Sequence, residues 1–156
     1  MQLSTRGRYA VMAMVELAGR PAGAPVTLAE IAACQQLSLC YLEQLFGCLR
    51  RAGLVVSARG PNGGYRLARP AEEVAIADIL DAVEENLRAT RCEPGGEGCM
   101  GEGAGRCATH ALWDELGRHI RLFLCGVSLA DVVEGRVAGR AEPVSPTPLS
   151  PTLEPA

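Results

Sequence analysis

The chain has 156 residues, 48 % of them hydrophobic and 21 % charged, and it carries a formal net charge of −3. These totals suffice for one ordinary domain with a hydrophobic core, or for a small domain with an appendage. No apolar run approaches the ~18–20 residues of a membrane-spanning helix, and Glu16 interrupts the apolar stretch near the N-terminus, unlike the core of a signal peptide. We therefore expect a cytoplasmic protein without a membrane partner.

Charge is distributed unevenly along the chain. Residues 1–69 contain eight arginines and three glutamates, a balance of +5, whereas residues 70–156 contain seven arginines and fifteen acids, a balance of −8. A basic first half favours a polyanionic partner for that half. By itself this signal is weak, because a charged face is usually only a solvated face.

The first elements in chain order are three helices. Apolar residues at helical spacing predict a helix that begins at Ser4 or Thr5. Thr27, followed three residues later by a glutamate, is a capping box and predicts a short helix over residues 28–36. A third helix is expected over residues 39–52 after a tight turn, with Gly53 as its end. Its apolar stripe comprises Leu39, Leu42, Leu45, Phe46 and Leu49.

Strands and further helices follow. The segments "LVVSA" and "YRLAR" are typical of two strands joined by the turn "RGPNGG". Helices are expected in "AIADILDAVEENL", over residues 111–124, and in "LADVVEGRV", where Ser128 is the cap. From Pro143 onward, five prolines in fourteen residues predict a disordered tail. The expected fold class is mostly α-helical with a small β-hairpin.

Two short helices joined by a tight turn and followed by a hairpin make the winged helix–turn–helix pattern, which is typical of DNA binding. The second helix fits the major groove, and its polar N-terminal half can reach base edges. Glu43 repels phosphate but can accept a hydrogen bond from a cytosine amino group, so it would filter sequences rather than add affinity. In the hairpin, Arg59 can pair with phosphate or enter the minor groove. The alternative is a hairpin that is only solvated and binds no DNA. The helix pair before it and the balance of +5 over residues 1–69 favour DNA binding over this alternative.

The candidate DNA contacts therefore form two groups. The reading helix supplies Ser38, Cys40, Tyr41, Glu43, Gln44, Arg50 and Arg51. The hairpin supplies Arg59, Gly60, Pro61, Asn62, Gly63 and Gly64, where small residues let the tip approach a backbone closely.

The seven cysteines argue against a full set of structural disulfides, because their number is odd and the expected compartment is reducing. Cys34 and Cys48 are expected to be small core residues, and Cys40 to be exposed. Clustered cysteines in such a compartment more often bind metal or do redox chemistry.

Cys92, Cys99, Cys107 and His110 lie in a stretch rich in glycine and glutamate, with six, seven and two residues between them. Thiolates and imidazole suit zinc or an iron–sulfur cluster. No CxxC pair typical of a zinc finger is present here, and the glycines leave room for a bulky inorganic core, so a cluster is favoured over zinc. A disordered linker, a thiol redox switch and a Cys–His catalytic pair remain as alternatives. The catalytic pair is the poorest, because a glycine loop offers no rigid pocket.

Ordering this cysteine loop costs ~1–2 kcal/mol per residue in backbone entropy, with little apolar burial to offset it. Metal–ligand bonds must supply the difference, and they require deprotonated thiolates. We therefore expect a loop that is ordered with metal and flexible without it. Such a two-state element suits a sensor.

Five segments in order resemble the IscR-type iron–sulfur cluster regulators: "LSTRGRYAVMAM", "LSLCYLEQLF", "RGPNGGYRLAR", "ATRC" and "CATHALW". The resemblance runs from residue 1 to about residue 137. It implies a homodimeric winged-helix transcription factor, without enzymatic activity, that binds double-stranded promoter DNA. It also implies a [2Fe–2S] cluster, delivered by a cluster-assembly scaffold and held by Cys92, Cys99, Cys107 and His110.

The resemblance further implies an organisation in four parts. They are a DNA-binding domain over residues 1–87 (helix pair 28–52, wing 54–69), a cluster-binding loop over 88–110, a dimerisation helix and C-terminal helix over 111–137, and the tail over 138–156. Alternatives are an iron–sulfur carrier or electron-transfer protein, a zinc-stabilised interaction module, and a regulator of the same fold that responds to redox change or nitric oxide.

Overall fold

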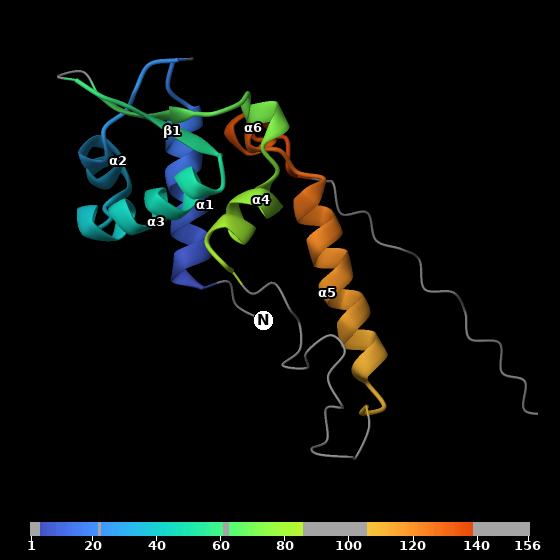
Figure 1. Ribbon diagram of the computed structural model, residues 1–156. Helices are drawn as coiled ribbons and strands as arrows, with labels where there is room; N and C mark the ends of the chain where they lie inside the picture. The colour runs from blue at the N-terminus through green and yellow to red at the C-terminus, as the bar shows by residue number, and fades with distance from the viewer. Residues whose placement is uncertain (1–3, 22, 61–62, 86–105, 139–156) are drawn as a thin grey trace, which may run out of the picture.

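The computed structural model describes residues 4–21, 23–60, 63–85 and 106–138 (Figure 1). The elements in order are α1 (Thr5–Ala18), α2 (Leu28–Gln35), α3 (Leu39–Arg51), β1 (Val55–Ala58), β2 (Gly64–Leu67), a 3-10 turn η1 (Ala71–Glu73), α4 (Ile76–Ala82), α5 (His110–Cys125) and α6 (Leu129–Val133). The expected class, mostly helical with one hairpin, is confirmed. The predicted tail lies almost wholly outside the described residues.

Local side chains set where several helices begin. Ser4 caps α1 through its hydroxyl, which settles the choice between the two candidate caps. Thr27 forms the expected capping box with Glu30 at the start of α2. Ser128 does the same with Asp131 at the start of α6. Each box satisfies backbone N–H groups that a helix otherwise leaves without a partner at its first turn.

The core lies between α1, α3, α4 and the hairpin. Its largest buried side chains are Phe46, Met14, Ile31, Leu42, Leu45, Leu49, Leu54, Ile79, Leu80 and Leu129. Four of the five residues predicted for the stripe on α3 are buried there, but Leu39 is 44 % exposed. Leu39 is the first residue of α3, so it lies at the edge of the buried face rather than over it.

The hairpin is attached to the segment before α2 and to α3. Its strands pair antiparallel, with Val55 opposite Leu67. Tyr65 exchanges two backbone hydrogen bonds with Val26, at 2.9 and 2.8 Å, and its ring packs edge-on against Phe46 with the centroids 4.9 Å apart. Since Phe46 belongs to α3, this contact sets the position of the hairpin relative to the predicted reading helix.

Two helices are shorter than expected. Helix α4 ends at Ala82, although the sequence pattern predicted a helix to residue 87. Glu84 adopts a left-handed conformation with φ +56°, so the helix has ended before Glu85, the last described residue of this segment. Helix α6 ends at Val133, shortly before Gly135 with φ +70°. A residue at positive φ cannot continue a right-handed helix.

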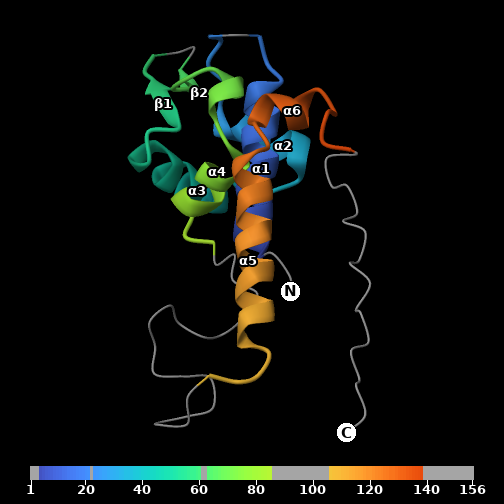
Figure 2. The ribbon, with the colours of Figure 1, turned by 90° about the vertical axis from the view of Figure 1, so that its right-hand side faces the viewer.

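Helix α5 extends beyond the other helices (Figures 1 and 2). It contacts α4, where Arg121 donates two hydrogen bonds to Asp81, at 3.0 and 2.7 Å. In the described chain no residue of α5 is buried. Five of its large apolar residues are instead exposed by 40 to 61 %: Leu112, Trp113, Leu116, Leu122 and Phe123. Among the described residues, no helix is both long and apolar enough to cross a membrane.

Candidate nucleic-acid interface and metal ligands

Helix α3 turns a polar face outward along the side opposite its buried stripe. Ser38, Cys40, Glu43 and Gln44 are exposed, and Tyr41 is half-buried. The hydroxyl of Ser38 makes no hydrogen bond within the helix end that it precedes, so it is available to another partner. The predicted base-contacting residues thus lie together on the first turns of α3.

The ring of Tyr41 packs against α1. Its ring meets the ring of Tyr9 edge-on, with centroids 6.0 Å apart and planes at 83°. Such a pair restricts the orientation of the phenol. The sequence reading missed Tyr9, because nothing in the local pattern of α1 indicates that this residue supports the reading helix.

The C-terminal end of α3 is basic. Arg50 and Arg51 are exposed there, where cations are favoured by the helix dipole. Cys48 lies half-buried between two guanidinium groups: its sulfur is 3.1 Å from Nη2 of Arg51 and 3.4 Å from Nη2 of Arg6 in α1. Arg6 is a second supporting residue that sequence reasoning missed.

One cysteine lies elsewhere than predicted. Cys34 is exposed rather than part of the core, whereas Cys40 is exposed as expected. Helix α2 is short and buries only Ile31 fully, so Cys34 falls on its outer side, with its sulfur 3.4 Å from Arg20.

The hairpin tip needs small residues for steric reasons. A Cβ on Gly63 would come within 2.6 Å of the carbonyl oxygen of Ala58, and Gly60 has φ +114°. The N–H of Gly63 donates to the carbonyl of Gly60 at 2.9 Å, which closes the turn. Arg59 is exposed beside it. Pro61 and Asn62 lie outside the described residues.

Two of the four predicted metal ligands are described. Cys107 and His110 are both half-buried and flank the start of α5, where the N–H of His110 donates to the carbonyl of Cys107 at 3.0 Å. Cys92 and Cys99 lie outside the described residues. Over the described ranges, no three His, Cys, Asp or Glu side chains are grouped so as to hold a metal ion. A cysteine sulfur and an imidazole, close in the chain at the start of a helix, are nevertheless donors that suit zinc or an iron–sulfur cluster.

The junction of α4 and α5 is an ion pair at the surface. The hydrogen bonds from Arg121 lower the pKa of Asp81, and Asp81 in turn raises the pKa of Arg121. Both side chains are about half exposed, at 53 % for Arg121 and 46 % for Asp81, so solvent screens much of this interaction. The pair therefore joins α4 to α5 but contributes little to the stability of the fold.

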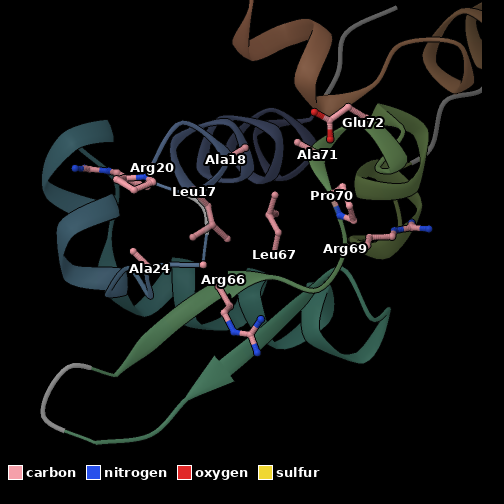
Figure 3. A pocket seen from close by; sticks show the side chains of 12 residues that line it. Leu17, Ala18, Arg20, Ala24, Arg66, Leu67, Arg69, Pro70, Ala71 and Glu72 are labelled. Carbon is pink, nitrogen blue, oxygen red and sulfur yellow. The ribbon is translucent and has the colours of Figure 1, made fainter.

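A pocket of about 420 Å³ lies between the end of α1, strand β2 and η1. Its walls are mainly apolar, from Leu17, Leu67 and Ala71 among others. In Figure 3 the side chains of Arg20 and Arg69 extend outward in opposite directions, and they pair with Glu16 and Asp78. Arg20 and Arg69 therefore do not converge on this pocket, and none of the predicted site residues lines it.

Comparison with known proteins supplies the remaining observations. The profile of the Rrf2 family, described as an iron-dependent transcriptional regulator, matches residues 3–135. The HTH-type transcriptional regulator IscR of Photorhabdus laumondii is 48 % identical over 146 residues, which cover 91 % of this chain and 87 % of that protein. IscR of Aliivibrio salmonicida is 49 % identical over 133 residues, covering 85 % and 77 %.

Solved structures show the same fold. CymR of B. subtilis, the global cysteine regulator, superposes with a TM-score of 0.72 at 32 % identity, covering 86 % of this chain and 98 % of that one. IscR of T. potens superposes with a TM-score of 0.69 at 34 % identity, covering 92 % and 94 %. The helix pair and hairpin thus correspond to a winged helix–turn–helix.

Proposed function

Since the chain belongs to the Rrf2 family of winged-helix, DNA-binding transcriptional regulators and is of the IscR type, we propose that it is a homodimer that senses iron–sulfur cluster status. In this proposal a [2Fe–2S] cluster is bound, and its presence alters the recognition of promoter DNA. The controlled genes would include those for cluster assembly.

One observation carries the proposal: two residues with soft donor atoms lie at the start of α5, a helix whose apolar face is not covered by the rest of the described chain. Cys107 lies just before α5 and His110 is its first residue, and Trp113 and Leu116 follow on that helix with exposures of 42 % each. Contiguous apolar surface of this kind marks an interaction site. The partner that we propose is α5 of a second copy, so that ligand binding and dimer geometry act on one helix.

The cluster ligands are Cys107 and His110 together with Cys92 and Cys99 from the cysteine loop. When bound, the cluster supplies an iron–sulfur core that is acquired and lost with cellular supply, a scaffold protein being the donor. The chain's own part is to present three thiolates and one imidazole nitrogen and to order the loop around them.

The DNA contacts follow from the polar face of α3 and the small-residue wing. Ser38, Tyr41 and Gln44 reach base edges or phosphates, and Glu43 selects against sequences that offer it no amino group. Arg59 enters the minor groove or pairs with phosphate, beside Gly60, Pro61, Asn62, Gly63 and Gly64. Cys40 lies among the base-contacting group, and Arg50 and Arg51 neutralise phosphates. In the proposed homodimer, two such DNA-binding domains contact a two-fold symmetric DNA site.

The test is a spectrum of the full chain isolated without oxygen. We expect visible absorption between roughly 400 and 600 nm, from charge transfer between sulfur and iron. Cys99→Ala should abolish it, whereas the matched change Cys34→Ala, at an exposed cysteine of α2, should leave it unchanged. Promoter DNA should then bind with different strength before and after removal of the chromophore. A colourless wild-type protein that contains zinc would refute the proposal.

A further inference from the structure

Glu85, the last described residue before the cysteine loop, reaches across to the start of α1. The backbone N–H of Ser4 donates to Oε1 of Glu85 at 2.7 Å, and the Ser4 hydroxyl donates to Oε2. The two residues are 81 positions apart in the sequence. This contact joins the start of α1 to the segment that leads into the cysteine loop, three residues before the predicted start of that loop at residue 88.

The contact has the form of a capping box whose acid comes from elsewhere in the chain. In α2, the acid at the third helical position, Glu30, accepts from the N–H of its own cap at 2.8 Å. In α6, Asp131 accepts in the same way from Ser128 at 3.0 Å. In α1 the third position is Gly7, which has no side chain, and Glu85 takes the place of the missing acid.

The geometry around Gly7 leaves room for this carboxylate and for little else. A Cβ added to Gly7 would lie 2.8 Å from Oε2 and 2.9 Å from Cδ of Glu85. Glycine at this position therefore removes a side chain that would collide with Glu85. The hydroxyl of Ser4 completes the box by accepting from the N–H of Gly7 at 3.2 Å.

The end of α4 is built to aim Glu85 at this position. The N–H of Glu84 donates to the carbonyl of Asp81 at 3.0 Å, and the N–H of Glu85 donates to the carbonyl of Leu80 at 2.9 Å. This is the paired hydrogen-bond pattern of a Schellman motif, which places its αL residue, here Glu84, at φ +56°. A glutamate in the left-handed region is strained relative to glycine, so the surrounding contacts must hold it.

From the first turns of α1 the connection continues to the reading helix. Arg6 lies two residues after Ser4 and contacts Cys48 of α3 at 3.4 Å. Tyr9 lies two residues after Gly7 and holds the ring of Tyr41. A displacement of the start of α1 therefore acts on both ends of the face of α3 that reads DNA.

We propose that Glu85 is a positioning residue that transmits the state of the cysteine loop to α3 through the N-terminus of α1. The inference rests on the proposed function, since it names the route by which the cluster would alter DNA recognition. Glu85 touches neither DNA nor the ligands in this scheme. It links one end of the ligand-bearing loop to the helix that supports Tyr41.

The first measurement compares two charge-neutralising variants of the full chain. For each we would determine the DNA dissociation constant with and without the chromophore and take the ratio of the two constants. Glu85→Gln should keep the chromophore but change this ratio towards one by a factor of about ten, which is within the usual range of coupling between sites. Glu84→Gln is the matched control, because among the described residues its side chain has no hydrogen-bond partner, and it should keep the wild-type ratio.

The second measurement separates positioning from simple helix capping. Glu85→Ala should lower the melting temperature of the chromophore-free protein and reduce the ratio. Adding Gly7→Asp to Glu85→Ala creates a capping box within α1 like that of Ser128 and Asp131, in the space that Glu85 vacates. The double variant should recover the melting temperature, but its ratio should remain low, because the new acid is not attached to the loop.

The outcomes are distinguishable. A wild-type protein without the chromophore, or with a ratio of one, overturns the proposed function and this inference together. A coloured Glu85→Gln variant with the wild-type ratio overturns this inference alone. So does a double variant that recovers the ratio along with the melting temperature, since Glu85 would then be only a cap.

Discussion

Gly64 and Gly47 should respond in opposite ways to the same added methyl group. Gly64 begins β2, and a Cβ there would lie 2.4 Å from the carbonyl oxygen of Val26 and 3.0 Å from the backbone nitrogen of Thr27. Gly47 lies within α3, and a Cβ there would meet nothing within 4 Å. The first site is closed by backbone, which cannot move aside cheaply, and the second is open.

The magnitudes follow from what must move. To relieve the clash at Gly64, the Val26 segment must shift, which disrupts its two hydrogen bonds with Tyr65 at 2.9 and 2.8 Å. At about 1 kcal/mol each, with part of the Thr27 cap contribution of about 1 kcal/mol, Gly64→Ala should destabilise the fold by about 2–3 kcal/mol. Gly47→Ala should stabilise it by about 0.5–1 kcal/mol, because alanine favours a helix interior over glycine.

The assay is urea unfolding of the chromophore-free protein at one fixed protein concentration, since the proposed dimerisation would make stability depend on concentration. DNA affinity gives a second reading. Gly64→Ala should also weaken it, because the wing is held relative to α3 through Tyr65 and Phe46. Equal midpoints for wild type and Gly64→Ala would show that the steric reasoning is wrong.

Further predictions concern the dimer, the DNA contacts and pH. Trp113→Asp should yield monomers in sedimentation equilibrium, because it places a charge in the apolar face of α5; dimers of wild-type stability would contradict the assignment of that face. Arg59→Ala should weaken cognate and random DNA equally and lower the salt slope by about 1, whereas Glu43→Ala should relax sequence preference; identical behaviour of the two variants would refute these roles. Hydrogen bonds from Gln35 and Arg20 lower the pKa of Glu16 below its ordinary value of 4.5. Its contribution to stability is therefore full above pH 4.5 and is lost as the pH falls through the folded-state pKa. The free energy of unfolding of Glu16→Gln should therefore fall less than that of the wild type as the pH is lowered.

Sequence alone determined the features that depend on near neighbours. The caps of α2 and α6 were predictable, and that of α1 to within one residue, because a capping side chain bonds to a backbone group within three residues. The hairpin was predictable from its turn residues and the buried stripe of α3 from its periodicity, because each of these signals lies within a short segment of the sequence. The family resemblance, carried by short contiguous motifs, is confirmed by the Rrf2 profile and the IscR relatives.

Only the tertiary structure decided features that join distant segments. The pattern of α2 did not indicate that Cys34 faces outward, because the face that a short helix buries is set by its neighbours. The early end of α4 depends on the left-handed Glu84, and the next residue, Glu85, bonds to Ser4 at the start of another helix. The capping of α1 by Glu85 joins residues 81 positions apart. Local periodicity carries no information about such a pairing; it exists because packing α4 against α1 brings a carboxylate to a helix N-terminus that lacks its own acid.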